Sequence, residues 1–309
     1  MLESEKKSDA IFGNHPFPPN KKKPLHIRGE LIRHFIYPAE RPHFSDLNYL
    51  YVSTDKLTVG TWQLAPGGHY DPPDLHAGDE VYYVLNGVLT EHNPVIGEFM
   101  RVKAGEALLL PMHGYHKGYN FEPGIMRILY VIAPKIWEDQ VPPMDFQAGR
   151  MKMYKGKYNR QMPDYPPIPQ WNIHGTTDDI GRWPVPGPEC RKDPILFYHI
   201  TEEKKLLNVH GTEYPMLVNF FVSNDLVHMG EFILPAGGTG SRASEPDAHA
   251  GDCVLFVQEG PVTVFLPGTL EAFDIQVEEA MFIPEGVRYQ LINYTGHPVK
   301  AIFSIAPGL

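Results

Sequence analysis

The sequence predicts an all-β protein that consists of two tandem domains, and three observations support this prediction. Short runs rich in Val, Tyr, Phe and Leu alternate with turns that contain Gly or Pro, and helical periodicity is hard to find. Residues 74–80, with the sequence DLHAGDE, return almost unchanged at residues 247–253 as DAHAGDC. The chain length of 309 residues suits two domains of ordinary size.

The repeat extends well beyond these seven residues. Asp247 follows Asp74 by 247 − 74 = 173 positions. The same offset relates three further pairs, which are Gly87 and Gly260, Pro111 and Pro284, and Asn120 and Asn293. Because a repeat of this length exceeds the roughly 20 to 50 residues of a solenoid unit, each copy is expected to be a whole domain.

Each copy is expected to form a β-sandwich or barrel, because its apolar runs are short and evenly separated by turns. In the first copy we expect strands at residues 57–64, 81–85, 107–110 and 126–132. In the second copy we expect them at residues 227–234, 254–257, 262–266, 280–283 and 301–305. The chain is therefore divided into an irregular N-terminal arm (1–45), a first barrel (46–135), a Pro-rich connection (136–215) and a second barrel (216–309).

The connection contains Trp137, Trp171 and Trp183, and this aromatic content favours a segment packed across the domains over a free linker. Proline-rich arms of this kind often complete a neighbour's sheet. We therefore expect a homodimer or a higher homo-oligomer.

Composition excludes several classes of partner. The formal net charge of −10 argues against nucleic acid, because phosphate binding needs a basic face. No run approaches the roughly 18 apolar residues that cross a bilayer, so we expect no membrane partner. The N-terminal residues do not lead into an apolar signal region, and two Cys do not make a disulfide framework. We expect a cytoplasmic protein that binds a small-molecule substrate.

The first copy contains a candidate metal site. His76 and Glu80 lie at the start of a predicted strand, and His116 lies in the loop after Pro111. Two imidazoles and one carboxylate are the usual donor set of non-haem Fe(II) sites. The period of two in a strand places Tyr82 on the same face as Glu80.

Two motifs of the first copy resemble those of the cupin superfamily, and the duplication resembles a bicupin. The first motif reads Gly68, five residues, Asp74-x-His76, three residues, Glu80, six residues, Gly87. The second reads Gly105, five residues, Pro111-x-His113, two residues, His116, three residues, Asn120. The resemblance implies two double-stranded β-helix (jelly-roll) barrels. It does not specify the reaction, because this scaffold hosts many activities.

The resemblance also implies the metal ligands. In the family, the residues that match His76, Glu80 and His116 bind a divalent metal. Asp74 replaces the first His of the family motif: it either ligates as a second carboxylate or caps the loop. A second carboxylate would favour Fe(II) or Mn(II), with Zn(II) or Ni(II) as the alternatives.

Other residues of the first copy are candidates for catalysis and substrate contact. Glu80 could move protons, and so could His113, which replaces a family Gly; the alternative for His113 is an exposed loop residue. The residues expected around the substrate are His69, Tyr82, Tyr115 and Tyr130.

The second copy has lost part of this donor set. Asp247 and His249 match Asp74 and His76, but Cys253 stands in place of the Glu and Tyr289 in place of the later His. We expect a barrel with a structural role. Two alternatives are a site like that of thiol dioxygenases, in which a Cys at this position is cross-linked to a Tyr, and an anion-sensing site. The residues of the anion site would be His249, Arg242 and Arg288.

The sequence therefore predicts a metal-dependent enzyme with one working site, in the first barrel, that acts on a small oxygenated substrate. A dioxygenase with Fe(II) is slightly favoured over an isomerase, epimerase or lyase that acts on a sugar or keto-acid. The hypothesis from another class is a non-catalytic metabolite-binding protein, and the retained ligands count against it.

Overall fold

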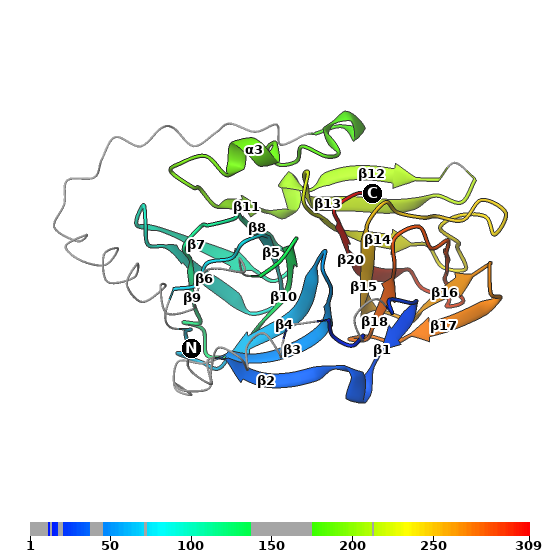
Figure 1. The fold of residues 1–309 in the computed structure, drawn as a ribbon, viewed down its shortest axis with the longest axis horizontal. Coiled ribbons are helices and arrows are strands. Elements are labelled where there is room, and N and C mark those ends of the chain that lie inside the picture. The colour runs from blue at the N-terminus through cyan, green and yellow to red at the C-terminus, as the bar shows by residue number, and fades with distance from the viewer. Residues whose placement is uncertain are drawn as a thin grey trace.

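The computed structural model describes residues 12, 14–17, 21–37, 46–70, 73–136, 175–211 and 213–309. It contains two β-barrel domains that lie side by side (Figure 1). The helices with assigned bounds are short: η1 (Gly29–Leu31), η4 (Thr177–Asp179), α3 (Gly187–Cys190) and η5 (Glu202–Lys204). The predicted all-β fold is confirmed. Within the described ranges, no helix has the length and apolar character that crossing a membrane requires.

The two halves of the chain contribute matching sets of strands. Those of the first half are β1 (Leu25–Ile27), β2 (Arg33–Tyr37), β3 (Asp46–Ser53), β4 (Thr58–Leu64), β5 (Asp79–Asn86), β6 (Val88–Asn93), β7 (Glu98–Lys103), β8 (Ala107–Leu110), β9 (Lys117–Tyr119) and β10 (Met126–Ala133). Those of the second half are β11 (Tyr198–Ile200), β12 (Leu206–His210), β13 (Met216–Ser223), β14 (His228–Leu234), β15 (Asp252–Glu259), β16 (Val262–Leu266), β17 (Glu271–Ile275), β18 (Ala280–Ile283), β19 (Gln290–Ile292) and β20 (Val299–Ala306).

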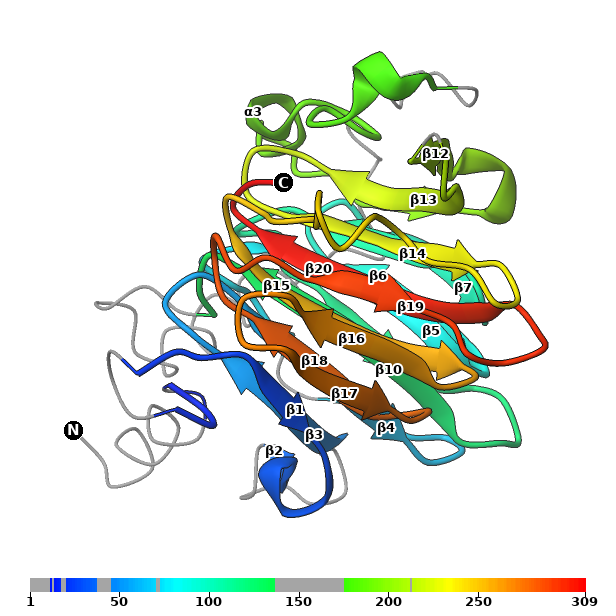
Figure 2. The ribbon, with the colours of Figure 1, turned by 90° about the vertical axis from the view of Figure 1, so that its right-hand side faces the viewer.

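Each barrel combines one large and one small antiparallel sheet. The first barrel has the seven-stranded order β11-β8-β5-β10-β4-β3-β2 and the three-stranded order β7-β6-β9. The second barrel has the orders β1-β18-β15-β20-β14-β13-β12 and β17-β16-β19. Figure 2 shows the large sheet of the second barrel from β12 at the top to β1 at the bottom.

The two halves exchange their first strands. β1, from the N-terminal arm, pairs with β18 of the second barrel, where Leu25 lies opposite Phe282. β11, from the connection, pairs with β8 of the first barrel, where Tyr198 lies opposite Leu109. Leu25 and Tyr198 are themselves related by the repeat offset of 198 − 25 = 173 positions. The duplication therefore begins within the arm.

The arm and the connection are thus more regular than the sequence predicted. The range 1–45 contains β1 and β2, and the range 136–215 contains β11 and β12. The two exchanged strands have only three residues each, which is too short to display an alternating pattern. The arm does complete a neighbouring sheet, but that sheet belongs to the same chain. Dimerisation stays a prediction.

One Trp of the connection packs into the second barrel. Trp183 is buried in the core of the second barrel, and its Nε1 donates a hydrogen bond to the carbonyl of Lys204 at 3.1 Å. Trp137 and Trp171 lie outside the described residues.

The two large sheets pack against each other through one shared apolar core. Along β5, Val81 and Tyr83 face the other barrel, whereas Tyr82 and Val84 face the interior of their own barrel. Tyr83 stacks on Phe221, with ring centroids 4.9 Å apart. The duplicated counterpart of this pair is Tyr51 and Phe256, whose centroids are 5.5 Å apart. Every central strand therefore has two buried faces, one for its own barrel and one for the other barrel.

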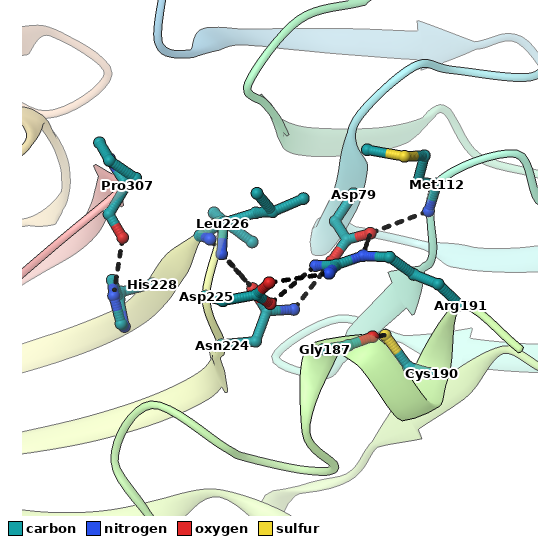
Figure 3. Close-up of polar contacts among 11 residues, drawn as sticks. Asp79, Met112, Gly187, Cys190, Arg191, Asn224, Asp225, Leu226, His228 and Pro307 are labelled. Carbon is teal, nitrogen blue, oxygen red and sulfur yellow. Dashed lines mark hydrogen bonds and ion pairs between the residues drawn. The ribbon is translucent and has the colours of Figure 1, made fainter.

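A buried His lies at the end of this shared core. Nδ1 of His228 lies 2.7 Å from the Ser223 hydroxyl. Its Nε2 lies 3.2 Å from the carbonyl oxygen of Pro307 (Figure 3). Because the carbonyl can only accept, Nε2 carries the proton and Nδ1 accepts from Ser223. Burial lowers the pKa of His228 from 6.5 to about 4.

This pKa predicts acid destabilisation. Between pH 6.5 and about 4 the unfolded chain protonates His228 while the folded protein does not, so stability falls as the pH decreases. The contribution is about 3 kcal/mol at most, since one pKa unit is worth about 1.4 kcal/mol. Replacement of His228 by Gln should lower stability at pH 7 but flatten its pH dependence below pH 6.5 in urea-unfolding measurements. Replacement of the exposed His297 by Gln is the control and should leave the profile unchanged. A His228→Gln profile parallel to that of the wild type would contradict the assignment.

Candidate metal centre

Backbone pairing brings the two motifs of the first barrel together. His76 lies in the loop before β5, Glu80 is the second residue of β5, and His116 directly precedes β9. The N–H of Asp74 donates to the carbonyl of His116 at 2.8 Å, and the N–H of His116 donates back at 3.1 Å. The N–H of His113 donates to the carbonyl of His76 at 3.0 Å. The loops that carry the two imidazoles are therefore held edge to edge.

The three side chains converge in the barrel interior. Oε2 of Glu80 lies 3.4 Å from Nε2 of His76 and 3.2 Å from Nε2 of His116. One ligand atom from each residue lies within 4.8 Å of the others, and all three side chains are buried. Glu80 Oε2 and His116 Nε2 have no hydrogen-bond partner. An unpaired polar atom in a protein interior is costly, so this geometry suits a cation bound between the three groups.

The electrostatics of the cluster favour a bound cation. Burial alone lowers the pKa of His116, but the neighbouring carboxylate of Glu80 outweighs it and raises the pKa to about 9. The negative charge of Glu80 thus stabilises a positive charge in the interior of the first barrel. Nδ1 of His116 lies 2.8 Å from the carbonyl oxygen of Gly114 and donates to it, so Nε2 is the nitrogen that faces Glu80 and that would bind a metal in exchange for its proton.

The two carboxylate oxygens of Asp74 match its two predicted roles, one as a loop cap and one as a metal ligand. Its Oδ1 accepts the N–H of Leu75 at 2.9 Å, as a loop cap would. Its Oδ2 lies 3.7 Å from Nε2 of His76 and faces the cluster. The role of Asp74 as a fourth ligand stays a prediction.

Aromatic side chains surround the cluster. The ring of Tyr82 lies 6.2 Å from that of His116, and the ring of Phe197 lies 6.5 Å from it. Tyr130 lies opposite Tyr82 in the sheet, and its buried hydroxyl has no hydrogen-bond partner. A Cβ at position 60 would come within 2.5 Å of that hydroxyl, so Gly60 leaves the space for Tyr130. Phe197 comes from the connection, and no sequence motif indicated that it would contact the site.

A second polar pair that the motifs did not indicate lies in the same interior. The hydroxyl of Tyr70 donates to Oε1 of Glu91 at 2.9 Å, and both side chains are buried. Burial raises the pKa of Glu91 to about 8. A Cβ at position 118 would lie 2.7 Å from the Tyr70 ring and 3.1 Å from Oε2 of Glu91, so Gly118 leaves the space for this pair.

The second barrel fills the same space with apolar groups. The matching strand registers identify the counterparts of Tyr70, Glu91 and Gly118 as Gly240, Val264 and Leu291. Val264 and Leu291 belong to the apolar core of that barrel. The fold therefore does not require the Tyr70–Glu91 pair. A position-by-position comparison of the two repeats was the signal that could have revealed it.

Three other predicted residues lie outside the cluster. His69 is half-buried against Tyr119, with ring centroids 5.7 Å apart. Tyr115 is half-buried in the loop that leads to His116. His113 is exposed and has a φ of 66°, close to the 71° of its counterpart Gly286. This left-handed conformation explains why the family has Gly at this position. An acid–base role for His113 stays a prediction.

The potential ligands of the second barrel are occupied by other contacts. Nε2 of His249 lies 2.7 Å from the Tyr289 hydroxyl, and Oδ1 of Asp247 lies 2.8 Å from Nε2 of His210. Cys253 is fully buried in the apolar core, and burial raises the pKa of its thiol. Within the described ranges, the only group of three metal-binding side chains is His76, Glu80 and His116. These contacts support a structural role for the second barrel.

Comparisons with known proteins agree with this architecture. Residues 60–132 match the model of the cupin domain family. No curated protein sequence matches the chain. Among solved structures, AerE from Microcystis aeruginosa has a TM-score of 0.55 at 10% identity, over 89% of this chain and 97% of that one.

Two enzymes are similar at the same level. Oxalate decarboxylase from Lactobacillus farciminis has a TM-score of 0.55 at 14% identity, over 95% of this chain and 88% of that one. Salicylate 1,2-dioxygenase from Pseudaminobacter salicylatoxidans has a TM-score of 0.50 at 14% identity, over 89% of this chain and 76% of that one. At these identities the likeness establishes the fold. Residues 60–132 match the cupin domain model, and the chain as a whole shares the two-barrel fold of these solved structures.

Proposed function

We propose that the protein is a metal-dependent enzyme with one metal centre, in the first barrel, that acts on a small oxygenated substrate. The observation that carries this proposal is the meeting of two imidazole Nε2 atoms and one carboxylate oxygen in the barrel interior. Two of these three atoms are buried without a hydrogen bond. A metal would satisfy them.

For the reaction we propose an Fe(II)-dependent dioxygenation. Two His and one carboxylate are the donor set of non-haem Fe(II) oxygenases, in which the metal keeps open positions. Bound Fe(II) would supply the site for oxygen and for a substrate oxygen atom. The fold shared with a salicylate 1,2-dioxygenase is consistent with this class but does not identify the substrate.

The surrounding residues would orient the substrate and exclude water. The hydroxyl groups of Tyr82 and Tyr130 would offer hydrogen bonds to substrate oxygens, and the Tyr130 hydroxyl has no other partner. Trp62 and Phe197 are buried apolar walls of the same interior. Their burial would keep the reacting atoms in a medium of low polarity.

One observation favours a second candidate, a metal-dependent isomerase, epimerase or lyase acting on a sugar or keto-acid. With a pKa of about 8, Glu91 retains its proton at neutral pH and can release it close to neutrality. Such a group is suited to general acid–base chemistry. In this candidate the metal polarises the substrate, and Glu91 exchanges a proton with it.

Metal analysis tests the centre itself. Purified protein should contain about one transition-metal ion per chain, and His76→Ala or His116→Ala should lose most of it, because each change removes one of three ligands. His249→Ala is the matched control, since His249 occupies the position of His76 in the second repeat, and it should keep the full load. A full load in His116→Ala would show that the ligand assignment is wrong. Two ions per chain would contradict the single centre.

Oxygen consumption separates the two reaction classes. Fe(II)-loaded protein should consume oxygen in the presence of a member of a panel of phenols, keto-acids and sugars. His116→Ala should abolish this consumption. Product formation under strict anaerobiosis would reject the dioxygenase and support the isomerase or lyase.

Glu91→Gln provides an independent test of the second candidate. Gln preserves the size of the side chain but cannot exchange the proton, so the metal load should stay at about one per chain in either case. An isomerase or lyase should lose about 10²- to 10⁴-fold in turnover, the usual contribution of a general acid or base. A dioxygenase should retain its turnover within about tenfold. Thr90→Ser, at the neighbouring position on β6, is the control.

A further inference from the structure

The strand that carries Glu80 also carries a buried carboxylate on its opposite face. Asp79 and Glu80 are consecutive in β5, so their side chains point to opposite sides of the sheet. Glu80 faces the candidate metal centre, whereas Asp79 faces the second barrel and is fully buried. A buried charge is tolerated only when it is paired and hydrogen-bonded. The partners of Asp79 are therefore structurally important.

Four N–H groups bind the two oxygens of Asp79 (Figure 3). Oδ1 accepts from Nε of Arg191 and from the backbone N–H of Met112, both at 2.9 Å. Oδ2 accepts from Nη2 of Arg191 at 2.5 Å and from Nδ2 of Asn224 at 2.8 Å. These donors come from three places: the loop after β8, the residue that follows α3, and the turn between β13 and β14 of the second barrel.

Through these bonds Asp79 connects the segments that carry two metal ligands. The main chain of Asp79 leads directly into Glu80. Met112 belongs to the loop that leads to His116. The bond from Met112 to Asp79 therefore ties the start of the Glu80 strand to the His116 loop. A shift of either segment would change the 3.2 Å separation between Glu80 Oε2 and His116 Nε2.

Arg191 and Asn224 are themselves held in place. Asp225 accepts two further bonds from the Arg191 guanidinium, each at 3.0 Å. Oδ1 of Asn224 accepts the backbone N–H groups of Leu226 and Val227 at 2.9 and 3.0 Å. A Cβ at position 187 would collide with Asp225, so Gly187 allows α3 to lie close to this turn. Met112, Arg191 and Asn224 thus form a clamp on Asp79, and two of these three residues lie outside the first barrel.

The duplication contains a second version of the same clamp. Asp252, the counterpart of Asp79, accepts bonds from Lys22 at 2.8 Å, Thr54 at 3.0 Å and the N–H of Glu285 at 3.2 Å. Lys22 also pairs with Asp55, as Arg191 pairs with Asp225. The second clamp has Lys22 and Thr54 in place of Arg191 and Asn224. Arg191 donates two hydrogen bonds to its carboxylate, whereas Lys22 donates one. Arg presents its donors in a fixed plane, so the first clamp fixes its carboxylate more firmly.

We propose that Arg191 and Asn224 are positioning residues for the metal centre: they hold Asp79, and through it the relative placement of Glu80 and His116. This inference rests on the proposed metal site. It assigns the second barrel a role in the site of the first, because that barrel supplies Asn224 and the Asp225 that locks Arg191. The clamp on Asp252 has no such effect, since Cys253 and Tyr289 occupy the ligand positions beside it.

The matched pair Arg191→Gln and Lys22→Gln tests the inference. Each removes the cation from one buried Asp and one neighbouring Asp, so both should lower the unfolding temperature. Mn(II) is the probe, and free Mn(II) is measured by electron paramagnetic resonance. Arg191→Gln should weaken Mn(II) binding by about 10- to 100-fold, the usual effect of losing an outer partner of a ligand. Lys22→Gln should stay within about threefold of the wild type.

The outcomes distinguish the inference from the metal site on which it rests. A wild-type protein that does not bind Mn(II) would overturn the metal centre and the inference together. Tight binding in the wild type with equal affinities in Arg191→Gln and Lys22→Gln would overturn the positioning role alone. If Arg191→Gln does not fold, Arg191→Lys and Lys22→Arg provide the same comparison with the charge retained. Arg191→Lys should then still bind Mn(II) more weakly than Lys22→Arg, and equal affinities would again overturn the role.

Discussion

The rest of the structure depends on the packing of the two large sheets against each other. Because every central strand is covered on both faces, each residue on it belongs either to its own barrel or to the layer between the barrels. In β5 this alternation places Glu80 beside His76 and His116 and places Asp79 in the inter-barrel layer. The exchange of β1 and β11 reinforces the layer, since each barrel is completed by a strand from the other half. Neither barrel is therefore independent of the other.

The two copies have kept this layer and diverged in their interiors. The stacked pair of Tyr83 and Phe221 has its counterpart across the layer, and so does the clamp on Asp79. Inside the barrels, Tyr70 and Glu91 in the first copy contrast with a Gly and a Val in the second. Burying a carboxyl group costs free energy unless it is paired, so an interior with no functional demand should become apolar. The second interior has done so, and the first has retained its polar groups.

The sequence predicted the parts of the fold that depend on local pattern and on repetition. The all-β class and the duplication followed from the strand pattern and the repeat. The proximity of His76, Glu80 and His116 was implied by the resemblance of the two motifs to those of the cupins. Contacts between remote segments could not be predicted in this way. Phe197 and Arg191 reach the first barrel from the connection, and a three-residue strand such as β11 has no period to recognise. Glu91 was missed because nothing in its own neighbourhood distinguishes a buried carboxyl from an exposed one.

The most direct test of the account is a crystal structure of the metal-loaded protein with anomalous scattering data collected at the absorption edge of the bound metal. The account predicts one strong anomalous peak per chain, between Nε2 of His76, Oε2 of Glu80 and Nε2 of His116, and no peak beside His249 and Tyr289. A peak of equal height in the second barrel, or a peak bound by other residues of the first, would contradict it.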